Sequence, residues 1–370
     1  MKTQVLAALD PDSSDEAVRQ AAEALARGDL VVFPTETVYG LGASAVHPQA
    51  IEAIHAIKDR PAEKPFSLHL PDPDLAERYA GPLSPVARRL IRKLWPGPVT
   101  LVVPDRRVGH GPEGLIETSV YWNGTVGLRC PSHRVGRAIL REAGVPVVAS
   151  SANLAGRPPP REAAEALADL CDRVPLIIDG GRTRYAGAST VVRVGEDDSF
   201  EVLREGAVTA RRIQRLARTR VLFVCTGNIC RSPMAEAMAR RMLADRMGCD
   251  PEFLEDRGIE VSSAGVAASE GLGPSEAAVQ VMAEREIDIR RHQSSPMTVD
   301  ALLSADYIYV MTRSHLAAVK RLAPEVAERV ALLDKEGGDI ADPIGGDAET
   351  YRACSNRIEQ ALRTRIAEIA

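Results

Sequence analysis

The chain has 370 residues, of which 45% are hydrophobic and 26% are charged, and its formal net charge is -5. This composition indicates a globular protein of two or three domains, and the acidic balance gives no support for broad attraction to nucleic acid or membrane surfaces. Six unevenly spaced cysteines fit neither a disulfide framework nor a set of zinc ligands. The apolar segment Val5–Leu9 is too short for a signal peptide or a membrane span, so we expect a cytoplasmic protein with no membrane partner.

The first half of the chain alternates helical patterns with short β-type runs. The strands expected here are Leu30–Phe33, Ser67–Leu70, Thr100–Val103, Val126–Arg129, Val145–Ala149, Leu176–Ile178, Thr190–Val194 and Phe200–Leu203. The next stretch, Ala207–Arg220, is arginine-rich around Ile213 and Leu216 and predicts a basic amphipathic connecting helix. Its simpler interpretation is a solvated helical linker.

From Val221 the pattern becomes strand–helix–strand–helix, which predicts a parallel sheet covered by helices. We expect a strand at Val221–Val224, a helix from Pro233, a buried strand at Tyr307–Met311 and a final helix at Glu349–Ile369. The predicted organisation is therefore a domain at 10–208, a basic linker helix at 209–218 and a second domain at 219–370.

The segment from Cys225 to Ser232, with the sequence CTGNICRS, lies between the predicted strand and helix of the second domain. Backbone N–H groups of a loop that enters a helix converge on one point and favour an anion there. A Cys225 thiolate would be stabilised by these donors, so that its pKa falls from about 8.5 to somewhere in ~3.5–7.5. Arg231 offers a planar fork for two phosphate oxygens. A turn with buried cysteines is the alternative, but the combination favours a phosphate site.

Together with Asp342-Pro343, this segment resembles the low-molecular-weight protein tyrosine phosphatase family, over residues 219–370. The resemblance implies a doubly wound parallel sheet and hydrolysis of a phosphoprotein through a cysteinyl-phosphate intermediate, with no metal or other cofactor. It assigns the nucleophile to Cys225, the oxyanion clamp to Arg231 and the proton donor to Asp342. We also expect Ser232 to donate a hydrogen bond to the leaving thiolate and Asn228 to adopt the unusual backbone angles of the loop.

The substrate of this domain is less clearly indicated. Ile229 resembles the tyrosine phosphatases, because the related protein-arginine phosphatases carry threonine there, whereas Gly345-Gly346 resembles the arginine-phosphatase type. We favour phosphotyrosine, since an apolar wall suits an aromatic leaving group. Arsenate reductases of this fold need further downstream cysteines, and the wide separation of Cys249 and Cys354 disfavours that activity.

Cys230 has two interpretations. The resemblance implies a reversible disulfide between Cys225 and Cys230 under oxidation. Residue type alone equally allows a packed thiol at Cys230.

Several motifs in the first half combine hydroxyls, cations and glycines. Phe33–Gly42 follows a strand, and Lys58-Asp59-Arg60 ends a helix that starts near Pro48. Such cations can complement a helix C-terminus or clamp phosphates. The motifs that follow are Trp95–Thr100, Gly127–Pro131, Ser150–Asn153 and Gly187–Thr190. In this order they resemble the YrdC-type threonylcarbamoyl-AMP synthases, over residues 10–208.

This second resemblance implies an α/β domain with a twisted, mixed sheet. Its expected reaction condenses L-threonine, bicarbonate or CO2, and ATP with Mg2+, and the product feeds the threonylcarbamoyl transferase machinery that acts on tRNA. ATP brings about four negative charges, which cations and Mg2+ would neutralise. The expected substrate-binding residues are Thr35, Tyr39, Lys58, Arg60 and Ser189. The expected ATP-binding residues are Lys58, Arg60, Arg129, Ser151 and Asn153.

Two alternatives come from other classes of function. One alternative is that the first half is an RNA-binding module tethered to a phosphatase, although the acidic balance argues against RNA binding as its main role. The chain can also be interpreted as a regulatory fusion with one inactive domain, although no motif is lost in either half.

Overall fold

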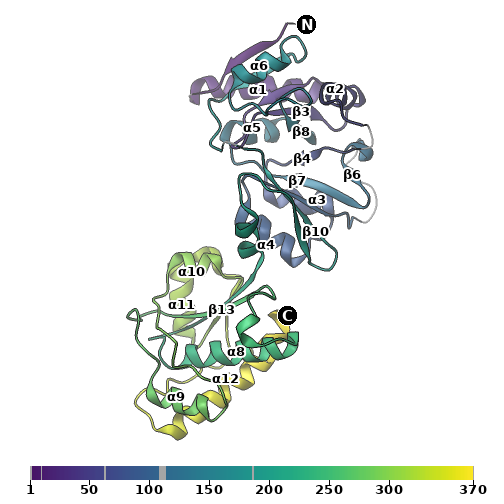
Figure 1. Ribbon diagram of the computed structural model, residues 1–370. Helices are drawn as coiled ribbons and strands as arrows, with labels where there is room; N and C mark the ends of the chain where they lie inside the picture. The colour runs from purple at the N-terminus through teal and green to yellow at the C-terminus, as the bar shows by residue number, and fades with distance from the viewer. Residues whose placement is uncertain (1, 10, 62–63, 108–113, 186, 370) are drawn as a thin grey trace. The chain divides into compact units, whose positions relative to one another are not determined.

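The computed structural model of the chain describes residues 2–9, 11–61, 64–107, 114–185 and 187–369. The chain divides into two compact units, unit 1 at Met1–Ala217 and unit 2 at Arg218–Ala370. Unit 1 runs from purple to teal in Figure 1, and unit 2 from green to yellow. None of the helices in these described ranges combines the length and the apolarity needed to cross a bilayer.

Unit 1 is built on one mixed sheet, which has eleven strands in the described part of the chain. The order is β1-β9-β2-β3-β8-β4-β7-β5-β10-β11, with β6 beside β7. The strands are β1 Gln4–Ala7, β2 Val31–Phe33, β3 Gly40–Ser44, β4 Ser67–His69, β5 Val99–Pro104, β6 Tyr121–Trp122, β7 Thr125–Arg129, β8 Val147–Ser151, β9 Leu176–Asp179, β10 Thr190–Val194 and β11 Phe200–Arg204. Because β2 and β9 are parallel while β3 and β8 are antiparallel, the predicted mixed sheet is confirmed.

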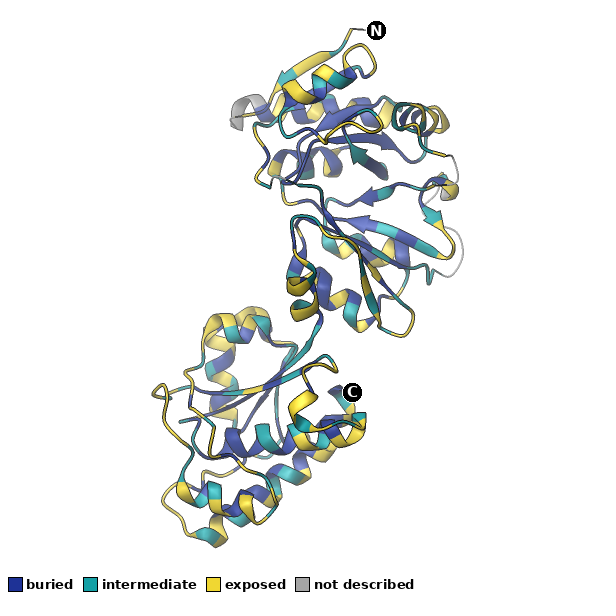
Figure 2. Ribbon diagram, in the orientation of Figure 1, coloured by how far each residue is buried: buried dark blue, intermediate teal, exposed yellow. Residues whose placement is uncertain are grey.

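Helices pack on both faces of the inner strands of unit 1, whereas the edge strands β1 and β11 are largely exposed (Figure 2). The helices are α1 Pro11–Arg27, α2 Pro48–Lys58, α3 Ala76–Ala80, α4 Pro85–Leu94, α5 Arg134–Glu142, α6 Ala163–Leu170 and α7 Ala210–Ala217, with short 3-10 helices at Pro73–Leu75 and Glu117–Ser119. Val31 and Phe33 pack in the core that includes α1 and α5, and Val32 packs in the larger core on the other face. Burial on both faces explains why this strand is continuously apolar.

The connecting helix is shorter than expected and packs on unit 1. It spans Ala210–Ala217, and Thr219 already belongs to the first strand of unit 2. Ile213 is fully buried in the larger core of unit 1, while Arg211 and Arg212 are exposed. The apolar side of this amphipathic helix therefore packs on the core of unit 1, and the helix is not a solvated linker.

Unit 2 has four parallel strands within the described residues, in the order β13-β12-β14-β15. They are β12 Thr219–Cys225, β13 Ile259–Gly265, β14 Tyr307–Val310 and β15 Val330–Leu332. The helices are α8 Arg231–Met247, α9 Glu276–Ala283, α10 Val299–Ser304, α11 Arg313–Leu322 and α12 Ala348–Ile369, with 3-10 helices at Pro251–Phe253 and Pro324–Val326.

Alternate residues of β12 reach the two cores of unit 2. Phe223 packs with residues of α8, α9 and α12, whereas Val224 packs with residues of α10 and α11. The predicted doubly wound parallel sheet is thus confirmed. Cys225 ends β12 at the carboxyl edge of the sheet, where such folds bind ligands. The helix expected from Pro233 begins two residues earlier, at Arg231, so that the arginine belongs to its first turn.

Two candidate active sites

A cavity of about 500 Å3 lies over the sheet of unit 1. Strands β4, β5, β7, β8 and β10 contribute to its lining, together with the segments that follow β2 and α2. Residues predicted to bind substrates line it from distant parts of the sequence: Thr35, Arg60, Arg129, Ser151 and Ser189. The strand order explains this convergence, because non-consecutive strands are neighbours in the sheet.

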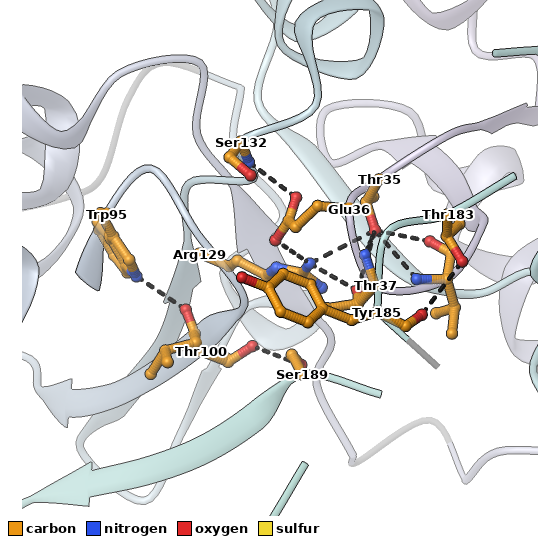
Figure 3. A network of polar contacts seen from close by, with 12 residues as sticks. Thr35, Glu36, Thr37, Trp95, Thr100, Arg129, Ser132, Thr183, Tyr185 and Ser189 are labelled. Atoms are coloured by element: carbon orange, nitrogen blue, oxygen red, sulfur yellow. Dashed lines mark hydrogen bonds and ion pairs between the residues drawn. The ribbon is translucent and has the colours of Figure 1, made fainter. Parts of the chain in front are cut away.

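Arg129 forms a buried ion pair in the wall of this cavity (Figure 3). Its Nη2 donates to Glu36 Oε1 at 2.8 Å and to Thr37 Oγ1 at 2.7 Å. Glu36 Oε2 also accepts the Ser132 N–H at 2.8 Å. Burial alone would raise the pKa of Glu36, but the Arg129 charge and these hydrogen bonds hold that pKa below its ordinary value.

Not all hydrogen-bond donors of the Arg129 guanidinium have an acceptor among the described residues. The residue is 5% exposed, and its Nε has no hydrogen-bond partner among the described residues. Buried donors normally have acceptors, and Arg129 lines the cavity. A ligand oxygen in the cavity can therefore supply the missing acceptor.

Lys58 ends α2 and reaches two of the predicted ATP-binding residues. Its Nζ donates to the carbonyl oxygens of Ser151 at 2.9 Å and Asn153 at 2.7 Å, and to Asn153 Oδ1 at 3.1 Å. Burial and the neighbouring Arg60 charge lower the pKa of Lys58 to about 8. These contacts unite the two motifs at one wall, with Ser151 facing the cavity.

Arg60 is oriented by the backbone that follows it. Its Nε donates to the Lys64 carbonyl at 3.0 Å, its Nη2 donates to the Pro65 carbonyl at 2.5 Å, and its guanidinium carbon lies 4.9 Å from the Phe66 ring centroid. Burial lowers its pKa from the ordinary arginine value. The guanidinium is therefore held at the cavity lining before any substrate binds.

In unit 2, the Cys225 sulfur faces the loop that follows β12. It accepts the Asn228 N–H at 3.2 Å and lies 3.0 Å from Ser232 Oγ, and the cysteine is 2% exposed. Asn228 has a φ of 55°, and its Nδ2 donates to the hydroxyls of Ser232 and Ser263, each at 2.8 Å. The asparagine thus adopts the left-handed backbone that the loop requires and ties the loop to its surroundings.

Arg231 closes the other end of the loop. It is 3% exposed, and it donates to the Ile340 carbonyl and to Thr226 Oγ1, both at 3.1 Å. Its Nη2 also forms an ion pair with Asp342 Oδ2, while Nε has no partner in the described part of the chain. The structure therefore brings Cys225, Arg231 and Asp342 to one site, with one buried guanidinium donor left unpaired among the described residues.

Comparisons with known proteins assign a family to each unit. The model of the Sua5_yciO_yrdC family, described as telomere recombination, matches residues 23–206. The low molecular weight phosphotyrosine protein phosphatase model matches residues 220–370. The chain belongs to both families. Unit 1 is therefore called the synthase-family unit, and unit 2 the phosphatase-family unit.

Individual relatives agree with this division. The threonylcarbamoyl-AMP synthase of Bacillus subtilis is 38% identical over 202 residues, which cover 55% of this chain and 57% of the relative. The putative threonylcarbamoyl-AMP synthase of Mycobacterium tuberculosis H37Rv is 35% identical over 216 residues, covering 57% of this chain and 94% of the relative. The protein-arginine-phosphatase of Geobacillus stearothermophilus is 38% identical over 153 residues, which cover 40% of this chain and 94% of the relative. The chain thus spans little more than half the length of the first relative, but nearly all of the other two.

Tyr39 lies apart from the cavity lining of the synthase-family unit. It is fully buried, and its hydroxyl donates to the Gly181 carbonyl at 2.7 Å and accepts the Gly180 N–H at 3.2 Å. Burial raises the pKa of this hydroxyl far above its ordinary value. This placement supports a structural role, so a direct contact of Tyr39 with threonine stays a prediction without support from the geometry.

The synthase-family cavity also contains polar residues that the motifs did not single out. Arg204 Nη2 donates to the Ser189 carbonyl at 2.9 Å, and the Ser189 hydroxyl lies 3.1 Å from Thr100 Oγ1. His69 is buried in the lining, where burial and the Arg129 charge lower its pKa to about 3. Arg204 ends β11 and His69 ends β4, outside the motifs of the sequence, so the motifs give no signal for their place in the lining.

Two histidines support the phosphatase-family loop from distant segments. His292 Nε2 donates to the Asn228 carbonyl at 2.8 Å, and His315 Nε2 lies 2.9 Å from Thr226 Oγ1. Burial and the Arg231 charge lower the pKa of His315. The Cys230 sulfur lies 3.2 Å from the hydroxyl of Tyr351, which belongs to α12. Cys225 and Cys230 are both free thiols, and their disulfide stays a prediction.

We expect pyrophosphate binding by the synthase-family unit to weaken as the pH rises through about 8, because Lys58 loses its charge there. Its pKa lies below the ordinary lysine value, so the cation is present below that pH and lost above it. Calorimetric titration with inorganic pyrophosphate measures the effect. Lys58→Arg is the matched control, since its guanidinium stays charged and both proteins meet the same ionisation of pyrophosphate. Identical pH profiles for the two proteins would contradict this role of Lys58.

Proposed function

We propose that the synthase-family unit makes threonylcarbamoyl-AMP from L-threonine, bicarbonate or CO2, and ATP. The observation that carries this proposal is the gathering of Arg60, Arg129 and the Lys58-supported Ser151 wall around one cavity. Its family membership and the names of its relatives support the same reaction.

The geometry suits a reaction between an amino acid and a polyanion. The threonine amine adds to CO2 to give a carbamate, and a carbamate oxygen attacks the α-phosphorus of ATP as pyrophosphate leaves. Arg60 and Lys58 would neutralise phosphate oxygens, and the open Nε of Arg129 would bind a substrate oxygen. Ser189 and Thr35, also in the lining, offer hydroxyls to threonine. Enclosure protects the short-lived carbamate from water.

The described lining of this cavity fits Mg2+ that enters with ATP. It provides hydroxyls such as those of Thr35 and Ser151 but no carboxylate among the described lining residues. Magnesium bound with nucleotides commonly takes phosphate oxygens and waters as most of its ligands. When bound, it would neutralise charge on the phosphates. We further infer a cytoplasmic setting, in which the product passes to transferase machinery acting on tRNA.

The phosphatase-family unit, we propose, hydrolyses a protein phosphate through a cysteinyl-phosphate intermediate. The supporting observation is the contact of the Cys225 sulfur with the Asn228 N–H, beside the buried Arg231 with its open Nε. Cys225 would attack phosphorus while loop amides and Arg231 hold the equatorial oxygens. The Ser232 hydroxyl, 3.0 Å from the sulfur, can then donate to the leaving thiolate.

Asp342 serves as the general acid in this proposal. Its carboxylate now lies against Arg231, and its side chain is 38% exposed. When phosphate takes the guanidinium edge, the released carboxylate can take a proton from solvent, give it to the leaving oxygen or nitrogen, and then accept a proton from the attacking water. Such acid–base help is typically worth about 10²–10⁴ in rate.

Phosphotyrosine is the substrate that we favour, because the partly buried Ile229 offers an apolar wall beside the loop. Phosphoarginine is the second candidate, supported by the protein-arginine-phosphatase relative and by Gly345-Gly346. A peptide panel tests the choice: we expect a higher kcat/KM for phosphotyrosyl than for phosphoarginyl peptides of the same sequence. The reverse order would assign the unit to phosphoarginine.

For the synthase reaction, Arg60→Ala and Lys58→Ala should each abolish threonine-dependent exchange of pyrophosphate into ATP, because the polyanion loses the Arg60 cation of the lining or the Lys58 cation behind the Ser151 wall. Hydrolysis of para-nitrophenyl phosphate by the same proteins should be unchanged. Arg193→Ala is the matched control, since Arg193 is exposed and pairs with Glu201 at the surface. Normal exchange in both cavity variants would refute the assignment of these cations.

For the phosphatase reaction, Arg231→Lys should lower kcat for para-nitrophenyl phosphate by at least about tenfold, the worth of one charged hydrogen bond. Lysine keeps the charge but cannot bind two oxygens with a planar fork. Arg241→Lys, an exposed exchange on the same helix, is the control. Cys225→Ser should be inactive. Near-normal turnover in Arg231→Lys would count against the bidentate clamp.

A further inference from the structure

Another cavity, of about 530 Å3, lies in the phosphatase-family unit between α8, α12 and the turn that follows α9. The two helices lie side by side (Figure 1). The residues that line the cavity from each helix are spaced mainly three or four positions apart, so each helix presents one face to it. We call this space the helix cavity.

The helix cavity lies apart from the Cys225 site. Cys225, Arg231 and Asp342 are absent from its described lining. Arg231 is the first residue of α8, whereas the lining begins at Met238, roughly 10 Å further along the helix axis, and extends to Asp245. The residues assigned to phosphate hydrolysis therefore leave this cavity without a role.

The floor of the helix cavity is apolar and adaptable. Met238 and Ile366 belong to the buried core of the unit. Met242 and Ile287 pack against that core but keep part of their surface open. The Ile287 N–H donates to the Met282 carbonyl at 3.0 Å, which holds the turn that carries this isoleucine. Methionine adapts to ligands of different shape, and an apolar group over Met242 and Ile287 would remove their surface from water.

Three arginines and two carboxylates also line the helix cavity. Glu359 is already engaged, because its Oε2 accepts a hydrogen bond from Arg285 Nη1 at 2.5 Å and its Oε1 accepts one from Arg363 Nη2 at 2.7 Å. The hydrogen bonds from Arg363 and Arg285 hold the pKa of Glu359 below its ordinary value, against the effect of partial burial. Glu359 is therefore ionised at neutral pH and shared by two guanidinium groups.

Arg241 has the loosest ion pair of the three lining arginines. Its Nε lies 3.9 Å from Asp245 Oδ1, beyond hydrogen-bond distance, and the two side chains are 45% and 70% exposed. Since three guanidinium groups line the cavity with two carboxylates, the lining carries one net positive charge. This excess and the planar fork of Arg241 match a ligand with a single carboxylate.

We propose that the helix cavity binds a small amphipathic carboxylate, with the apolar body over Met242 and Ile287 and the carboxylate at Arg241. The volume of the cavity falls within the roughly 300–1,000 Å3 that is typical of small-molecule sites. The proposal goes beyond both proposed reactions and depends on neither, since none of the residues assigned to them is in the described lining.

Fluorescence titration of the full-length protein with anilinonaphthalene sulfonate tests the site, because this dye joins apolar rings to one negative charge. Arg241→Gln should raise the Kd of the dye roughly two- to fivefold, and Asp245→Asn should lower it by a similar factor, as expected for one exposed charge interaction. Arg246→Gln, an exposed exchange on the same helix outside the described lining, is the matched control. Equal Kd values in wild type, Arg241→Gln and Asp245→Asn would overturn the proposal.

A neutral dye separates the charge contact from the apolar contact. Phenylnaphthylamine has the same rings without the sulfonate, so its Kd should be unchanged in Arg241→Gln and Asp245→Asn. Met242→Gln keeps the length of the side chain but makes it polar, and it should raise the Kd of both dyes at least roughly threefold. An equal loss of both dyes in Arg241→Gln would refute the charge contact, and unchanged binding in Met242→Gln would refute the apolar floor.

Competition tests the chemical class of the ligand. Decanoate should displace the bound sulfonate dye at lower concentrations than decanol, which has the same chain without the charge. Displacement by both compounds at equal concentrations would show that the cavity selects apolar chains alone, and it would overturn the carboxylate assignment.

Discussion

Each candidate site depends on a guanidinium group that is held in the interior of its unit by a carboxylate. Arg129 is paired with Glu36 and Arg231 with Asp342. Removing one partner of a buried pair typically costs roughly 3–5 kcal/mol, because the remaining charge has no compensation. The Glu36 side chain is 4% exposed and that of Asp342 is 38% exposed. The first carboxylate is therefore enclosed in the wall of its cavity, whereas the second is partly open to solvent.

Residues that are close in the sequence were the most predictable parts of both sites. Cys225, Asn228 and Arg231 occupy one turn between a strand and a helix, so local geometry brings them together whatever the rest of the fold. The sheets could also be predicted from the sequence, because apolar runs such as Val221–Val224 alternate with helical segments. Asp342 was different. An Asp-Pro pair alone indicates only a turn, and the resemblance to a family was needed to place it at the loop.

Contacts between distant segments set the limit of prediction. His292 is 64 residues from Asn228, and His315 is 89 residues from Thr226, yet both contacts support the loop from Cys225 to Ser232. The cavity in unit 1 similarly depends on a strand order that the sequence does not reveal, so no motif indicates the contact of Arg204 with Ser189. The contact of the buried Tyr39 hydroxyl with Gly181 depends on the same order. The arginine-rich helix was misread for the same reason: its partner surface for Ile213 exists only in the folded unit.

Gly127 lines the cavity of unit 1, and its close neighbour Ser67 limits which residues can replace it. A β-carbon at position 127 would press on the Ser67 hydroxyl, so the smallest exchange there requires Ser67 to shrink or move. Positions 67 and 127 lie on adjacent strands, β4 and β7, and are constrained as a pair. Evolution, or a designer who wants a narrower cavity, must therefore change both residues together, and the two positions should co-vary wherever this architecture is reused.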